Sequence, residues 1–323
     1  MREKQLMIGI PTKDHPKYIQ YYLAKILPAS KKYNIDIYIY DSSVDDETEG
    51  IVKRRVEQGY SNLFYRRFHE EILIEDKLGY IFINNKYEYI WLCGDGVIAS
   101  LEKDMDILLK EMEKGRDLIL FGQALEDGFA RGYNYTGNNY IEYTDIVKFL
   151  EDCWAPLTYY GASVVRGNLF SKKQWDEYRK KYKEQVQPAC FFEVFKEGEF
   201  NGVYIVQDFF EANPYKIQAE WVKKGRLFDA FTGIMANTIN SLPHKYDASK
   251  KKIEKSLDKY TGSFSFSHLW ILRSNGNLNL KKALKYRRQI RRMCLVNYKI
   301  ILIVAICPKK IADTVAVILG NTW

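Results

Sequence analysis

Along the first 121 residues, short apolar runs alternate with longer segments in which apolar side chains recur at helical spacing. The short runs are rich in β-branched and aromatic residues and end at turn-forming residues, which is typical of buried β-strands. Apolar residues three or four positions apart predict amphipathic helices. The predicted strands and helices are, in chain order, Gln5–Ile10, Pro16–Tyr33, Ile35–Tyr40, Glu49–Gln58, Leu63–Phe68, Glu70–Asn84, Tyr87–Leu92, Leu101–Glu113 and Asp117–Phe121.

Strands that alternate with helices predict an α/β fold with a mostly parallel, doubly wound sheet. The alternation weakens after Gly122, although strand-like runs recur at Pro156–Arg166 and Val203–Val206. Further along the chain the spacing becomes helical. We therefore expect two domains, a ligand-binding α/β domain over residues 1–225 and a helical C-terminal region over residues 226–323.

Three of the predicted strands run into short segments that suit ligand binding. These are Ile8–Thr12, Tyr40–Asp46 and Trp91–Gly96, and each places a small, acidic or backbone-exposing residue just past a strand. Open α/β sheets bind ligands at this edge. A carboxylate there, such as Asp41, can accept a hydrogen bond from a base N–H or a ribose hydroxyl. The alternative is that Asp41 only stabilises a turn or caps the N-terminus of a helix. Together the segments predict a nucleotide site.

Composition and charge narrow the function classes. The net charge of +8 is uneven, because seven basic residues lie within Lys281–Arg292. Such clustering indicates an anionic surface as partner and not a nucleic acid. The five cysteines lack CxxC spacing, which argues against a zinc site or a disulfide framework and favours a reducing, cytoplasmic setting. No apolar signal region is expected at the N-terminus, and there is no Walker loop, GxGxxG motif or nucleophile elbow.

The order of the three segments resembles the family-2 glycosyltransferases. Their nucleotide-sugar domain has an opening strand that ends in Pro-Thr or a similar pair, then an Asp-x-Ser-x-Asp turn, then an Asp-x-Asp-type strand end. The resemblance covers Gln5–Asp208, about two thirds of the chain, and lies in the order of the motifs more than in any one of them. It implies a GT-A (Rossmann-like) fold and inverting transfer of a sugar from a nucleoside-diphosphate sugar, with a UDP-sugar favoured. The acceptor would be a hydroxyl of a glycan or lipid-linked molecule, as in the synthesis of a bacterial surface polysaccharide such as a capsule.

The resemblance also implies a set of donor-binding residues. Pro11 and Thr12 would lie beside the base and ribose, Asp41 would hold the base, and Lys77 would screen diphosphate charge unless it is a solvated helical lysine. The full implied set is Pro11, Thr12, Asp41, Ser43, Asp76, Lys77, Gly94, Asp95 and Gly96. A second implied group is Tyr159, Tyr160 and Gly161, which match the place where relatives shape the donor sugar and the acceptor cleft. The alternative role of the two tyrosines is packing in the core.

The chain departs from the family at the third segment. Relatives usually carry two Asp there, one of which binds a divalent ion that bridges the diphosphate. This chain has a single carboxylate, Asp95, followed by Gly96 and Val97. Either Asp95 binds Mn²⁺ or Mg²⁺ with help from water or a distant residue such as His244, or a Lys or Arg replaces the charge of the ion. Metal dependence is therefore open.

Inverting transfer needs a base that deprotonates the acceptor hydroxyl, and a carboxylate suffices. In the resembled family this residue comes well after the Asp-x-Asp strand. Asp208, directly after the apolar run Val203–Val206, fits best, with Glu193 and Glu211 as rivals and a helix N-cap as its structural alternative.

Two other function classes are weighed against a glycosyltransferase. A nucleotidyltransferase shares strand-end carboxylates, but would ordinarily need a Gly- and Arg-rich phosphate loop that Pro11–Asp14 does not supply. A non-catalytic nucleotide-sugar-binding protein that has lost the second Asp is the other.

The C-terminal stretch predicts a different partner. The basic segment Lys281–Arg292 precedes two apolar runs, Leu295–Cys307 and Ile311–Leu319, and neither reaches the ~20 residues that span a bilayer. We expect an interfacial amphipathic anchor on the anionic inner face of the cell membrane, which would favour a lipid-linked acceptor. The alternative is a helical hairpin packed on the catalytic domain or on a second copy in a homo-oligomer.

Overall fold

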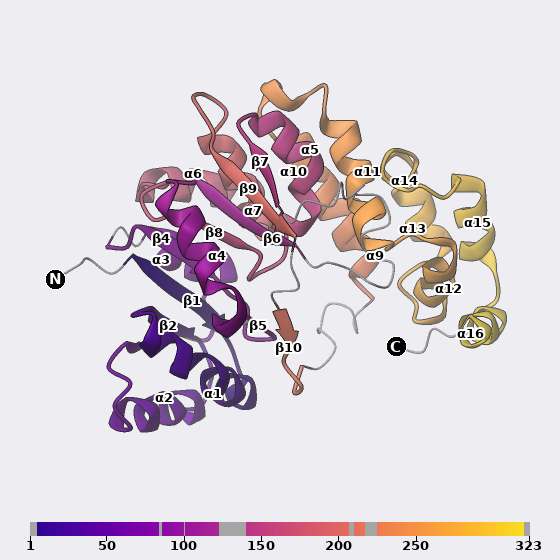
Figure 1. The fold of residues 1–323 in the computed structure, drawn as a ribbon. Helices are drawn as coiled ribbons and strands as arrows, with labels where there is room; N and C mark the ends of the chain where they lie inside the picture. Colours follow the sequence, from indigo (N-terminus) through magenta and orange to yellow (C-terminus); the bar gives the residue numbers. More distant parts are fainter. Residues whose placement is uncertain are drawn as a thin grey trace. The chain divides into compact units, whose positions relative to one another are not determined.

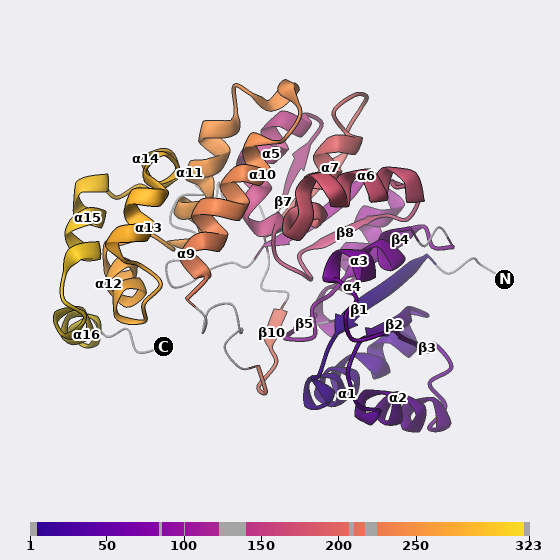
Figure 2. The same cartoon turned by 180° about the vertical axis from the view of Figure 1, so that it is seen from behind.

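The computed structural model describes residues 5–83, 86–99, 101–122, 140–206, 210–216 and 225–319 (Figures 1 and 2). The chain divides into two compact units. Unit 1 consists of Met1–Ala124, Gly137–Ile146 and Pro156–Lys216, and unit 2 consists of Leu125–Thr136, Val147–Ala155 and Ile217–Trp323.

Among the described residues, unit 1 contains an eight-stranded sheet with the order β3-β2-β1-β4-β8-β6-β9-β7. The β3-β2-β1-β4 half is parallel throughout and β6 pairs in parallel with β9, whereas β8 and β7 run antiparallel to their neighbours. This confirms the predicted α/β fold with a mostly parallel sheet. The strands are β1 (Leu6–Thr12), β2 (Asp36–Asp41), β3 (Leu63–Arg67), β4 (Tyr89–Leu92), β6 (Leu118–Gly122), β7 (Tyr140–Tyr143), β8 (Ser163–Arg166) and β9 (Gly202–Val206), and a small antiparallel sheet pairs β5 (Val97–Ala99) with β10 (Phe210–Ala212).

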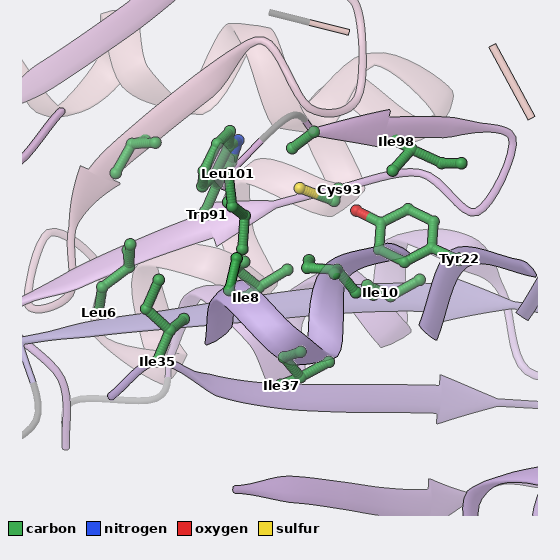
Figure 3. Close-up of a cluster of buried hydrophobic side chains, with 14 of the residues drawn as sticks. Leu6, Ile8, Ile10, Tyr22, Ile35, Ile37, Trp91, Cys93, Ile98 and Leu101 are labelled. Carbon is green, nitrogen blue, oxygen red and sulfur yellow. The ribbon is translucent and has the colours of Figure 1, made fainter. Parts of the chain in front are cut away.

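Helices cover both faces of the parallel half. On one face, Ile8 and Ile10 of β1 pack with Tyr22 of the first helix in a buried apolar cluster (Figure 3). The opposite face carries Gly9, where an added Cβ would lie 2.7 Å from the Ile81 side chain, so the glycine lets α3 approach the sheet closely. The helices of unit 1 are α1 (Pro16–Lys32), α2 (Glu47–Glu57), α3 (Ile74–Phe82), α4 (Leu101–Glu113), α6 (Lys172–Tyr182), a 3₁₀ turn Lys183–Gln185 and α7 (Val186–Val194).

Some elements differ from the sequence prediction. The predicted helix Glu70–Asn84 is shorter and forms only over α3. The predicted strand Pro156–Arg166 forms only over β8, because its first residues complete a helix, α5 (Ile146–Leu157), that begins in the preceding segment. Helix α7 was not predicted; it is buried almost all round and therefore has no amphipathic period to detect.

The described part of unit 2 is helical, as the spacing of apolar residues in the C-terminal region predicts. Its core joins aromatic and aliphatic side chains such as Phe228, Phe264, Leu272 and Ile301. Over the ranges that the structure describes, no helix combines the length and the apolarity needed to cross a membrane. Besides part of α5, the helical segments are α9 (Leu227–Asp229), a π-helical segment Ala230–Met235, α10 (Ala236–Asn240), a 3₁₀ turn His244–Tyr246, α11 (Lys250–Thr261), α12 (Phe266–Ser274), α13 (Leu280–Lys285), α14 (Arg287–Met293), α15 (Tyr298–Ile306) and α16 (Lys309–Ile318).

Candidate functional site

The register of the parallel strands brings the three strand-end segments together. Thr12, the last residue of β1, lies opposite Asp41, the last residue of β2. On the other side of β1, Gly9 pairs with Leu92, the last residue of β4. Because the two strands are parallel, the residues that follow Leu92 lie near Thr12 at the end of β1. There the Thr12 hydroxyl donates a hydrogen bond to Asp95 Oδ2 over 2.7 Å. Residues that are 83 positions apart in sequence are therefore in contact at the carboxyl edge of the sheet.

Asp41 is fully buried at the end of β2. Its Oδ1 accepts hydrogen bonds from the Ser43 amide at 2.8 Å and the Ser43 hydroxyl at 2.5 Å, and its Oδ2 accepts one from the Tyr65 hydroxyl at 2.9 Å. Burial and the neighbouring Asp41 raise the pKa of Tyr65. The Ser43 hydroxyl in turn accepts the Asp14 amide at 2.8 Å. The Asp41 carboxylate thus orders the turn after β2 and ties it to the loop after β1.

Lys77, on α3, connects the same two loops through its buried side chain. Its side chain is buried, and its Nζ donates to the Thr12 carbonyl at 2.8 Å and to the Ser42 hydroxyl at 2.9 Å. Desolvation lowers the pKa of Lys77 to about 8, while the charges of Asp41 and Asp95 act in the opposite direction. The predicted residues Thr12, Asp41, Lys77 and Asp95 therefore form one connected cluster.

His15 belongs to this cluster, although the sequence analysis did not single it out. Its Nδ1 lies 2.9 Å from Asp95 Oδ2, the oxygen that also accepts the Thr12 hydroxyl. Since a carboxylate oxygen only accepts, Nδ1 carries the proton in this pair. The hydrogen bond to Asp95 raises the pKa of His15, and the half-exposed ring stacks on Tyr18 with 4.3 Å between centroids.

The segment with the second predicted group reaches the end of β4. The Gly161 amide donates to the Leu92 carbonyl at 2.7 Å, and the Gly161 carbonyl accepts Trp91 Nε1 at 2.6 Å. Gly161 has a φ of +100°, a conformation that strains other residues. A Cβ added to Gly94 would lie 3.3 Å from the Tyr160 Cβ, so these two residues are neighbours. Burial raises the pKa of Tyr160.

Asn213 is a further residue that sequence reasoning missed. Its side-chain amide donates to the Asp95 carbonyl at 3.0 Å and to the Tyr18 carbonyl at 3.1 Å, and its backbone amide donates to the Gly96 carbonyl at 3.1 Å. Asn213 follows β10, which pairs with β5 just after Gly96. One buried side chain therefore holds the Asp95 loop from a segment 118 residues away.

Three other predicted residues are less closely connected to this cluster. Asp76 precedes Lys77 on α3 but forms an ion pair with Arg179 of α6. Pro11 is buried within β1, and Tyr159 is exposed.

The predicted base and its rivals differ in environment. Asp208 lies outside the described residues. Glu193 is buried and accepts hydrogen bonds from the side chains of Lys181 and Tyr182, at 2.6 and 2.5 Å, whereas Glu211 is exposed. His244, in unit 2, is fully exposed, with Nδ1 3.0 Å from an Asp247 oxygen.

Asp95, the carboxylate predicted to bind a cation, has hydrogen-bond donors around its Oδ2 among the described residues. Within the described ranges, no three His, Cys, Asp or Glu side chains gather in a group that could hold a metal ion. The neighbours of Asp95 Oδ2 are the hydrogen-bond donors Thr12 and His15. The described residues around Asp95 therefore do not form a cation site by themselves.

Comparisons with known proteins identify the fold. No family model matches the chain, and no curated protein matches it. Its structure is similar to that of TarS from S. aureus, a GT-A-type glycosyltransferase, with a TM-score of 0.55 and 14% identity over 98% of this chain and 54% of TarS. For TarS 1–349 in complex with UDP-GlcNAc, the TM-score is 0.51, with 12% identity over 99% of this chain and 93% of the other.

A mannosyltransferase from Pyrobaculum calidifontis, PcManGT in complex with GDP-Man and Mn²⁺, gives a TM-score of 0.49 and 10% identity over 98% of this chain and 87% of the other. This chain spans about half (54%) of the length of the longer TarS chain. At these identities the likeness is one of fold, and this fold is the one expected from the sequence. The chain has the GT-A fold, with a mostly parallel Rossmann-like sheet and C-terminal helices.

Proposed function

We propose that this protein is a glycosyltransferase whose unit 1 binds a nucleoside-diphosphate sugar at the carboxyl ends of β1, β2 and β4. The observation that carries the proposal is the cluster in which Thr12 and His15 converge on Asp95 while Lys77 joins the loops after β1 and β2. Ligands of open α/β sheets bind at this edge. TarS 1–349, whose structure is similar, was crystallised with UDP-GlcNAc, and this favours a UDP-sugar as donor.

Each residue of the cluster has a role in this proposal. Asp95 accepts a hydroxyl of the ribose or of the donor sugar. With Nδ1 of His15 bonded to Asp95, Nε2 is the ring nitrogen that donates to a diphosphate oxygen, and the raised pKa of His15 favours the charged ring. The positive charge of the buried Lys77 screens the negative charge of the diphosphate. Asp41 acts through the turn it orders, which with Pro11 forms the side of the site that holds the base.

The sugar and acceptor side of the site is proposed to lie along Tyr159–Gly161. Tyr160 lies beside Gly94, and the exposed Tyr159 can stack on the C–H face of a sugar. Asp208 is the proposed base that removes the acceptor proton in an inverting transfer, and the acceptor is a hydroxyl of a glycan or lipid-linked molecule.

A binding panel tests donor recognition. The melting temperature is measured with UDP-, GDP- and thymidine-diphosphate sugars, with and without Mn²⁺. We expect at least one nucleotide sugar to stabilise the protein and Asp95→Asn to abolish the shift, whereas Asp106→Asn, an exposed carboxylate on α4, retains it. If no nucleotide sugar changes the melting temperature, the proposal is wrong.

The substrate consumed and the product released separate the alternatives. A glycosyltransferase releases the nucleoside diphosphate from a nucleotide sugar, a nucleotidyltransferase releases pyrophosphate from a nucleoside triphosphate when a sugar phosphate is supplied, and a binding protein releases neither. We expect nucleoside diphosphate, formed in the presence of a membrane-lipid or glycan extract as acceptor. Asp208→Asn is expected to abolish this release and to leave donor binding intact.

A further inference from the structure

The outer faces of α15 and α16 are apolar where an ordinary surface helix is polar. Both helices pack against α12 in unit 2, and in both views they lie at the end of that unit (Figures 1 and 2). The inner face of α15 packs into the core of unit 2, where Ile301, Val304 and Ala305 are buried. The outer faces of α15 and α16 are exposed.

On α15 the exposed positions follow the helical repeat. Ile303 is 61% exposed and Ile306 60%, and with Lys299 and Ile300 they lie on one face of the helix. Isolated apolar residues on a surface need no explanation. Three isoleucines on one solvent-facing stripe are a patch.

The patch continues across the short connection into α16. Cys307 and Pro308 join the two helices, and Ile306 before the connection and Ile311 after it are both exposed. Further along α16, Val317 is 66% and Ile318 75% exposed. We call this patch the apolar edge, and it consists of Ile300, Ile303, Ile306, Ile311, Val317 and Ile318.

Basic residues outnumber acidic ones on the two helices of the apolar edge. Lys299, Lys309 and Lys310 are exposed on the same two helices. Asp313, the one acidic residue between 295 and 319, accepts a hydrogen bond from the Ser274 hydroxyl at 2.5 Å. The preceding α14 adds further cations, of which Arg291 lies over the Tyr298 ring at the start of α15. An apolar stripe flanked by exposed lysines is complementary to a surface that is apolar inside and anionic outside.

We propose that the apolar edge is a membrane-docking surface that inserts its isoleucines at the headgroup boundary of an anionic bilayer, with the lysines contacting the headgroups. Apolar insertion and attraction to anionic lipid act together in such interfacial helices. The proposal needs no transmembrane helix. It is independent of the proposed function, because it rests on unit 2 and on no residue of the nucleotide cluster.

Vesicle sedimentation of the full chain tests the proposal. We expect the protein to sediment with phosphatidylcholine vesicles that contain phosphatidylglycerol, and to remain in the supernatant with phosphatidylcholine alone or at high salt. Ile303→Glu should weaken partition about tenfold, and the double variant Ile303→Glu/Ile306→Glu about a hundredfold, because each removes one inserted side chain. The control is Val56→Glu on α2, where Val56 is 43% exposed, and it should bind like the wild type.

The electrostatic part has its own pair of variants. Lys309→Gln/Lys310→Gln should weaken partition about thirtyfold, since each lysine near the surface contributes about 1 kcal/mol. Lys251→Gln/Lys255→Gln removes two exposed lysines of α11 and should change partition little. Circular dichroism melting verifies that each variant is folded, which substitutions at exposed positions should allow.

Three results would each overturn the proposal. The first is that the wild type does not sediment with anionic vesicles, and the second is that Ile303→Glu sediments as well as the wild type. The third is a stable dimer in analytical ultracentrifugation that Ile303→Glu dissociates, which would make a second copy of the chain the occupant of the apolar edge. A variant that fails to bind the nucleotide sugar changes none of these three results.

Discussion

Replacing Lys77 with Met tests the energetics of the nucleotide cluster. The folded protein lowers the pKa of Lys77 from 10.5 to about 8, so holding the charged amine in the fold costs about 3 kcal/mol at neutral pH. The substitution removes that cost, but it also removes the hydrogen bonds to the Thr12 carbonyl and the Ser42 hydroxyl, worth roughly 1–1.5 kcal/mol each. The two effects nearly cancel. At pH 7 we expect the free energy of unfolding to change by less than about 1.5 kcal/mol.

The pH dependence isolates the lysine. Because the pKa is lower in the folded state, the unfolded chain binds more protons between about pH 8 and 10.5, and wild-type stability gains from this group as the pH rises through that window. From pH 7 to pH 9.5 the gain is about 2 kcal/mol. Lys77→Met lacks the group and lacks the gain. Other groups titrate in both proteins and cancel in the difference.

The assay is urea unfolding of wild type and Lys77→Met at the two pH values. We expect the wild type to be more stable relative to the variant at pH 9.5 than at pH 7, by about 2 kcal/mol. A difference that does not change with pH would refute the reasoning that Lys77 is a desolvated cation in the folded protein.

Two further predictions rest on particular contacts, and a third tests the proposed base. Gly122→Ala should lower the free energy of unfolding by about 2–3 kcal/mol, because the added Cβ would lie 1.6 Å from the Tyr204 hydroxyl. Gly50→Ala, in an open part of α2, should raise the free energy of unfolding by about 0.5–1 kcal/mol, and urea unfolding measures both. Between pH 6 and 7.5, UDP affinity measured by calorimetry should fall more steeply for wild type than for His15→Gln, by up to about fivefold, since the raised pKa of His15 carries its charge into this range; equal slopes would contradict its contact with phosphate. Asp208→Asn should retain nucleotide-sugar affinity and lose product release, and retained release would exclude Asp208 as the base.

The sequence was sufficient to predict the parallel half of the sheet and the meeting of its strand ends. Apolar runs in the sequence predict β1, β2 and β4. Because parallel strands end at the same edge of a sheet, Thr12 and Asp95 are expected to lie close together from the sequence alone. Helix α7 could not be found in the same way, because a helix that is buried all round has no polar face.

The details of the cluster depend on contacts that no local pattern encodes. Successive residues of a helix point about 100° apart, so only the fold determines that Lys77 enters the cluster while Asp76 pairs with Arg179. Asn213 reaches Asp95 across 118 residues. His15 carried one usable signal, its place directly before α1 in the loop after β1, where ligand-facing residues of α/β sheets occur.

Hydrogen–deuterium exchange with and without UDP-GlcNAc tests the central claim most directly, because it locates the bound nucleotide. The account predicts slower exchange in the three strand-end segments Ile8–Thr12, Tyr40–Asp46 and Trp91–Gly96, and unchanged exchange in α11 of unit 2. Protection that appears elsewhere and leaves these three segments unchanged would contradict it.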